Sequence, residues 1–96
     1  MKLEFHPEAL AEFESAADFY HSRQLGLGSR FLDSVDRCTS RIKADPQRFR
    51  KFDKEIRRAL VAVFRYAIFF FVRSDRIFLL AEMRCSREPG YWRSRT

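Results

Sequence analysis

Apolar residues recur at helical spacing in the first half of the chain and alternate at strand spacing in the second half. From residue 7 to residue 23 they fall three or four positions apart, which predicts a helix with one apolar face formed by Leu10, Phe13, Ala16, Ala17 and Tyr20. Pro7 suits the first position of this helix, where no backbone N–H is needed. Residues 2–5, KLEF, alternate and predict a short strand.

A second helix is predicted between the sequence LGLG and Pro46. Gly26 and Gly28 supply a flexible or left-handed turn between the two helices. The helix is expected to end at Asp45, because a residue that precedes proline disfavours the helical conformation. Its apolar residues again repeat at helical spacing and are Phe31, Leu32, Val35, Cys38 and Ile42.

The remainder of the chain predicts three strands. Residues 46–55 show no clean period, and we interpret them as a basic connector or one irregular turn. Residues 56–64, 66–72 and 76–84 are rich in strand-forming side chains, and the polar residues between the last two predict a tight hairpin. Alternation places Ile68, Phe70 and Val72 on one face of the middle strand and Phe69, Phe71 and Arg73 on the other. In the last strand it places Ile77, Leu79, Ala81 and Met83 opposite Phe78, Leu80, Glu82 and Arg84.

These elements predict one α+β domain spanning residues 1–96. A short N-terminal strand, a helix hairpin and three antiparallel strands would form one sheet with the helices packed on one face. Because the middle strand is apolar on both faces, we expect its second face to be at least partly covered as well. Phe69 and Phe71 lie on that face, and we expect them in a surface that a partner protein buries.

No stretch of the chain is long enough and apolar enough to predict a membrane span. A spanning helix needs about 20 apolar residues, whereas Arg65 and Arg73 interrupt the longest apolar stretches. The N-terminus also lacks the apolar segment of a signal peptide. We therefore expect a cytoplasmic protein without a membrane partner, in which Cys38 and Cys85 are unpaired thiols.

Charge separates the two halves of the chain. Residues 1–45 contain eight acidic and six basic residues, whereas residues 46–96 contain five acidic and thirteen basic residues. This asymmetry favours an anionic partner, either nucleic acid or an acidic protein segment. The alternative is an arginine-rich solvated surface.

Arginines on or beside the strands are the main candidates for binding chemistry. Held on a rigid sheet, they could grip a phosphate or a partner carboxylate, and could stabilise a phosphoryl transition state without a metal. Alternation places Arg57 and Arg58 on opposite faces, so that only one can share a surface with Arg84. Tyr91 or Glu55 could take part in proton transfer. The full set is Arg57, Arg58, Arg65, Arg84, Arg87, Tyr91, Trp92 and Arg93.

No other cofactor or catalytic pattern is present in the sequence. There is no glycine-rich phosphate loop, and the two histidines and two cysteines do not have the spacing of metal ligands. We expect no metal and no cofactor. His6 and His21 are interpreted as helix-capping or surface residues, because they lie far along the chain from the arginines.

Five segments, taken in order, resemble the RelE/ParE superfamily of toxins from bacterial toxin–antitoxin modules. They are FHPEALAEFESAADFY, GLGSRFLDSV, IKADPQRF, IRRALVAVFRYAIFFFV and REPGYW, and together they span about 90 residues. The resemblance implies an antitoxin with an acidic, partly apolar C-terminal segment that folds over the toxin. The hairpin and the EPGYW tail are similar to the ParE-like members, which block DNA gyrase.

The resemblance leaves three functions open. The favoured one is a growth-inhibiting toxin that binds DNA gyrase. The second is a ribosome-dependent endoribonuclease that cleaves messenger RNA, with Arg58, Arg65, Arg84 and Tyr91 as its catalytic residues. Relatives of that type often carry histidine at the end of the last strand, where this chain has Arg84, so only an arginine-based mechanism would remain. The third is a non-toxic remnant that still binds the antitoxin.

Overall fold

A five-stranded sheet and a helix hairpin form the fold. The computed structural model describes residues 2–61, 63, 64 and 66–84, the last four through their backbone. Strand β1 (Lys2–Phe5) leads into α1 (Pro7–Arg23) and α2 (Leu27–Ala44). The 3-10 turn η1 (Pro46–Arg48) follows, and then the strands β2 (Lys51–Asp53), β3 (Ile56–Val61), β4 (Tyr66–Arg73) and β5 (Arg76–Arg84).

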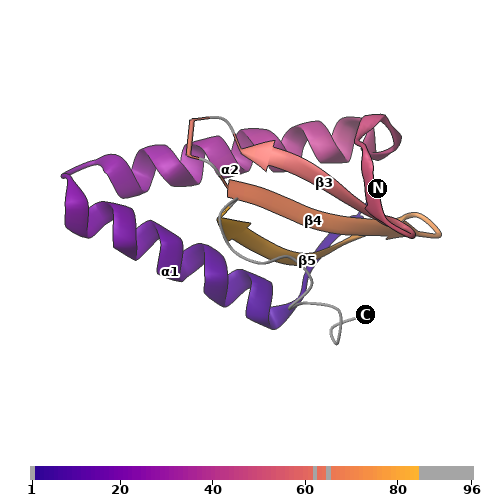
Figure 1. The fold of residues 1–96 in the computed structure, drawn as a ribbon, viewed down its shortest axis with the longest axis horizontal. Helices are drawn as coiled ribbons and strands as arrows, with labels where there is room; N and C mark the ends of the chain where they lie inside the picture. The colour runs from indigo at the N-terminus through magenta and orange to yellow at the C-terminus, as the bar shows by residue number, and fades with distance from the viewer. Residues whose placement is uncertain (1, 62, 65, 85–96) are drawn as a thin grey trace.

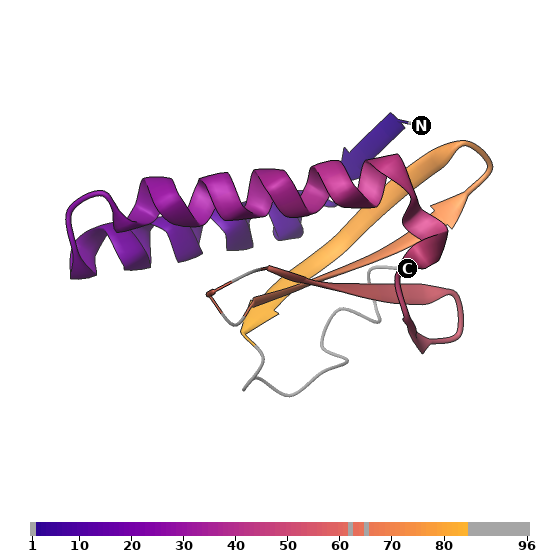
Figure 2. The ribbon, with the colours of Figure 1, turned by 90° about the horizontal axis from the view of Figure 1, so that it is seen from above.

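Both helices pack on the same side of the sheet (Figures 1 and 2). The strands lie in the order β1-β5-β4-β3-β2. Strand β1 runs parallel to β5, and every other neighbouring pair is antiparallel. The α+β class and the helices on one face are therefore confirmed, but the sheet differs from the prediction in two strands.

The first difference is β2, which lies within the stretch that we interpreted as a connector. It has only three residues and pairs with β3 through a register shift, so it leaves no alternation that a sequence pattern could detect. The second is that β1 pairs with β5 in parallel orientation, whereas the sequence predicted an antiparallel sheet. An ion pair from Arg76 Nη1 to Glu4 Oε1, 2.6 Å long, joins these two strands.

The helix boundaries agree with the sequence. His6 caps α1, since its Nδ1 accepts a hydrogen bond of 3.1 Å from the backbone N–H of Glu8. Helix α2 begins after Gly26, whose φ of 82° lies in the left-handed region that favours glycine. It ends at Ala44, and Asp45 caps it immediately before Pro46. His6 is thus a capping residue, as expected.

The main core lies between the helix hairpin and the sheet. Phe31, Ile42 and Ile68 are fully buried there, and Phe70, Ile77 and Leu79 complete its centre. Tyr20 packs its ring 5.1 Å from that of Phe31 and donates a hydrogen bond of 3.3 Å to the carbonyl of Phe64. Two residues that we predicted in the apolar faces of the helices are not buried: Leu10 and Leu32 are each 47% exposed.

The alternation of β4 is confirmed on both of its faces. Ile68 and Phe70 belong to the main core, whereas Phe69 belongs to a second cluster on the opposite face of the sheet. Strand β5 departs from simple alternation, because Phe69 pairs with Ala81 while Phe70 pairs with Leu79. Leu80 is therefore an extra residue in the strand, so the simple alternation that we predicted along residues 76–84 is interrupted at this point.

Gly28 allows the two helices to approach closely. It lies inside α2 and not in the turn, which differs from our expectation. A Cβ atom at this position would lie 2.8 Å from the carbonyl oxygen of Ala17 and 3.0 Å from the Cβ of His21. Because both of these atoms belong to the rigid part of α1, the helices would have to separate to admit a side chain.

We expect Gly28→Ala to lower the free energy of unfolding by about 1–3 kcal/mol, the usual cost of overpacking. Chemical denaturation of the purified protein measures this change. Ser29→Ala is the matched control, because Ser29 is the exposed neighbour in the same helical turn. Equal stability of the Gly28→Ala variant and the wild type would contradict the close helix contact.

Candidate partner-binding face of the sheet

The face of the sheet opposite the helices carries its own apolar cluster, which we call the second face. Ala67, Phe69 and Leu80 are buried in it, and Ile56 and Phe71 are packed against it in part. These residues come from β3, β4 and β5. Phe69 is 1% exposed, so the expectation that its ring lies at the surface of the chain is wrong.

Aromatic rings nearer the surface surround this cluster. Phe52 is 37% exposed and packs edge-on against Phe69, with ring centroids 5.2 Å apart. The register of β2 shifts between Lys51 and Asp53, which leaves Phe52 as the extra residue of a bulge. Phe71 stacks on Phe78 at 5.0 Å. The partly accessible rings of the second face therefore include Phe52, Phe71 and Phe78, and the sequence analysis identified Phe71 among them as a site residue.

A basic pocket adjoins Phe52. It has a volume of about 280 Å³ and is lined by Arg50, Lys51, Phe52 and Arg58. The guanidinium of Arg58 lies 5.9 Å from the centroid of the Phe52 ring. Lys51 also forms an exposed ion pair of 3.6 Å with Glu55, a type of contact that adds little to stability. Planar guanidinium groups beside an aromatic ring suit a carboxylate or phosphate joined to an apolar group.

A second pocket repeats this chemistry near the β4–β5 hairpin. It measures about 210 Å³ and is lined by Lys54, Glu55, Ile56, Phe71 and Arg73. Arg73 lies over the Phe71 ring, with its guanidinium carbon 5.3 Å from the centroid. Among the described residues, the two pockets together contain five cationic residues and one carboxylate, that of Glu55. This part of the second face therefore suits an anionic partner that also carries apolar groups.

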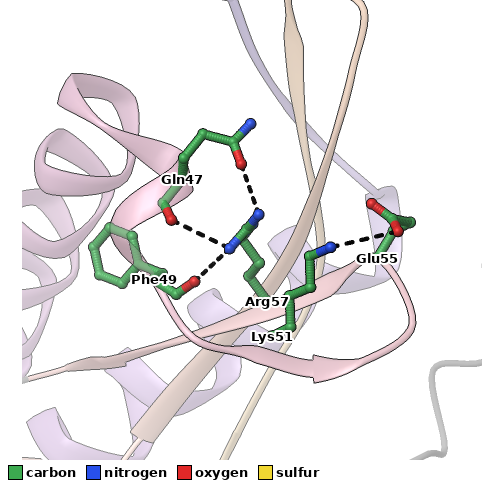
Figure 3. Close-up of polar contacts among 5 residues, drawn as sticks. All are labelled: Gln47, Phe49, Lys51, Glu55 and Arg57. Carbon is green, nitrogen blue, oxygen red and sulfur yellow. Dashed lines mark hydrogen bonds and ion pairs between the residues drawn. The ribbon is translucent and has the colours of Figure 1, made fainter.

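Arg57, by contrast, is held by the chain itself (Figure 3). Its Nη1 donates hydrogen bonds to the carbonyls of Phe49 at 2.6 Å and Gln47 at 3.3 Å. Its Nη2 donates to Gln47 Oε1 at 2.6 Å. Arg57 pairs with Phe70 of the main core, whereas Arg58 pairs with Phe69 of the second face. The two arginines do lie on opposite faces, and Arg57 links β3 to the η1 segment.

Arg84 is not brought next to Arg58. Arg84 pairs with Tyr66, whereas Arg58 pairs with Phe69, so their strands are separated by β4 and their positions are offset by three residues. Strand spacing and rise place the two backbone positions about 14 Å apart. Of the other predicted site residues, Arg65, Arg87, Tyr91, Trp92 and Arg93 lie outside the described residues.

Arg50, Lys51 and Phe52 were missed as site residues. Their signal was the basic composition of residues 46–55, which we interpreted as a connector and not as an edge of the sheet. Because β2 is the edge strand of the sheet, these basic residues line a surface pocket.

The described residues offer no metal-binding cluster and no spanning helix. No group of three His, Cys, Asp or Glu side chains among them could hold a metal ion. In the same part of the chain, no helix is long and apolar enough to cross a membrane. His21 is exposed in the last turn of α1, and the thiol of Cys38 is buried.

Comparison with known proteins adds a family match. The family model described as "ParE toxin of type II toxin-antitoxin system, parDE" matches residues 3–89. No curated protein matches the sequence. A solved structure described as "Chromosomal ParDE TA system from P. aeruginosa" superposes with a TM-score of 0.66 at 18% identity, covering 88% of this chain and 95% of that one. At this level of identity the structural similarity shows the fold alone.

We expect Arg57→Ala to lower the free energy of unfolding by about 2 kcal/mol, because it leaves the carbonyls of the η1 segment without their charged donor. Arg58→Ala is the matched control on the neighbouring position and should cost less than about 1 kcal/mol, since it loses only a contact with an exposed ring. Thermal or urea unfolding of both variants provides the comparison. Equal losses, or a larger loss for Arg58→Ala, would show that Arg57 does not hold the η1 segment in place.

Proposed function

The chain belongs to the ParE toxin family of type II toxin–antitoxin systems, and on that premise we propose that it inhibits growth by binding DNA gyrase. A cognate antitoxin would neutralise it through an acidic, partly apolar C-terminal segment. The match over residues 3–89 is the observation that carries this proposal, because it spans both helices and all of the described strands except Lys2 at the start of β1.

The second face supports the antitoxin part of the proposal. Its pocket cations and its partly accessible aromatic rings complement a segment that alternates carboxylates with apolar side chains. Arginine binds carboxylates with two parallel hydrogen bonds, and aromatic rings provide large contact areas at small entropic cost. The area around Arg58 and Phe52 would bind one carboxylate, and that around Arg73 and Phe71 another.

The pocket chemistry supports binding over catalysis. Arginine and lysine side chains keep their protons near neutral pH, so they are poor general bases. Among the described residues that line the two pockets, the remaining ionisable group is Glu55, which is paired with Lys51. His6 and His21 lie at the two ends of α1, away from the pockets. These features favour a toxin that acts by occupying a protein surface.

An endoribonuclease is the second candidate, favoured by one observation. Proteins that bind single-stranded nucleic acids also use cationic side chains beside an exposed aromatic ring, and the pocket lined by Arg50, Arg58 and Phe52 has this arrangement. Arg65, Arg84 and Tyr91 stay predictions for this role. A non-toxic protein that retains antitoxin binding is the third candidate.

We expect the purified protein to inhibit supercoiling by bacterial DNA gyrase and to leave a translated reporter messenger RNA intact. A supercoiling assay and primer extension in a cell-free translation reaction measure the two outcomes. The complex with the antitoxin is the control. It should neither inhibit supercoiling nor cleave the messenger RNA.

Cuts that appear only during translation would contradict the gyrase proposal and establish the endoribonuclease. If cells that produce the chain grow normally and neither assay shows an effect, the third candidate function remains: a non-toxic protein that binds the antitoxin.

A further inference from the structure

A groove separate from the second face lies between α2 and the turn that joins β3 to β4. Its volume is about 410 Å³, larger than either pocket of the second face. It is lined by Ser34, Arg37, Ser40, Arg41 and Val63. Helix α2 lies on the helix-covered side of the sheet (Figure 2), so the sheet separates α2 from the second face.

Val63 is held in an unfavourable backbone conformation at this groove. Its φ is 76°, in the left-handed region, where a β-branched residue is an outlier. Lys54 and Ser74 also have positive φ values, but neither side chain is β-branched. The side chain of Val63 is 85% exposed, so its packing within the chain does not offset the strain. Strain of this kind is typical of functional sites, where the side chain itself is needed.

The two arginines of the groove, Arg37 and Arg41, form no ion pair with the described residues. Arg37 Nε donates to the carbonyl of Asp33 at 3.4 Å, and Arg41 Nη2 donates to the carbonyl of Leu60 at 3.1 Å. Neither has a carboxylate within ion-pair distance among the described residues. Their spacing of four residues on a helix brings the like charges together, which is unfavourable for the free chain.

Strand β3 fixes the position of these groups. The carbonyl of Leu60 accepts hydrogen bonds from both Arg41 and the buried thiol of Cys38, at 3.1 Å and 3.6 Å. These contacts tie the middle of α2 to the end of β3, close to the turn that presents Val63. The groove is therefore a preorganised surface, which lowers the entropic cost of binding.

We propose that this groove is the contact surface for the target protein, and that it binds an acidic segment of the target with an aliphatic side chain against Val63. Charge complementarity argues for this occupant, because two uncompensated guanidinium groups flank an exposed apolar side chain. The inference rests on the proposed function, since it requires a toxin that acts by binding a protein. The antitoxin segment binds the second face, across the sheet.

The test compares growth inhibition by the full-length variant R37E/R41E with that by the wild type. The variant should need at least about tenfold more protein for half-maximal inhibition, because it reverses both charges that contact the target. R30E/K43E is the matched control, since it makes the same charge change at exposed positions of α2 that do not line the groove. The control should stay within about twofold of the wild type, and the cognate antitoxin should bind all three proteins equally.

Val63→Gly keeps the test decisive if the loss of the Arg41 hydrogen bond impairs folding. Glycine adopts a positive φ without strain, so the variant should unfold at the same temperature as the wild type or a higher one. It should still lose toxicity at least about tenfold, because the apolar contact is removed. Reduced toxicity without reduced stability is an outcome that a purely structural role of Val63 does not produce.

Wild-type toxicity in both R37E/R41E and Val63→Gly would overturn the inference. Loss of antitoxin binding by either variant would also overturn it, because the groove would then belong to the antitoxin. If both variants lose toxicity while the wild type leaves gyrase supercoiling unchanged, the gyrase proposal is wrong and the groove still contacts another target. A wild type without toxicity would overturn both proposals.

Discussion

The constraint on which the structure depends is that β4 is apolar on both faces. Ile68 and Phe70 on one side and Phe69 on the other are almost completely buried, and each such side chain contributes about 1.5–3 kcal/mol when it leaves water. One pair of helices can cover only one face of a sheet. The other face needs a different solution, and the chain supplies additional apolar residues there through bulges at Phe52 and Leu80.

Charges around the second face then determine what kind of partner it suits. Arg57 and Arg58 are neighbours in sequence, but one is bound by backbone carbonyls of the η1 segment and the other lines a basic pocket beside Phe52. The alternation of β3 produces this division of roles. The sheet itself separates the second face from the groove on α2, which gives the chain two distinct surfaces: we propose the first for its antitoxin and the second for its target.

Most of the fold could be predicted from the sequence, because helix periodicity, Pro7, Gly26 and Pro46 act locally. Strand β2 could not, since three residues with a bulge leave no repeating pattern. The parallel pairing of β1 could not either, because nothing in a four-residue strand specifies which edge it joins. The candidate site was predicted only in part. The predicted residues included Arg58 and Phe71, and alternation placed Arg57 and Arg58 on opposite faces without deciding between them. Arg50, Lys51 and Phe52 were identified only from the position of β2 at the sheet edge.

The central claim is that the antitoxin covers the second face, and amide hydrogen exchange of the toxin with and without its cognate antitoxin tests it most directly. The account predicts that exchange slows at least about tenfold in residues 50–58, which form the edge of that face. It predicts little change in the exposed groove residues of α2, including Arg37. Protection confined to the helix hairpin, with residues 50–58 unchanged, would contradict the account.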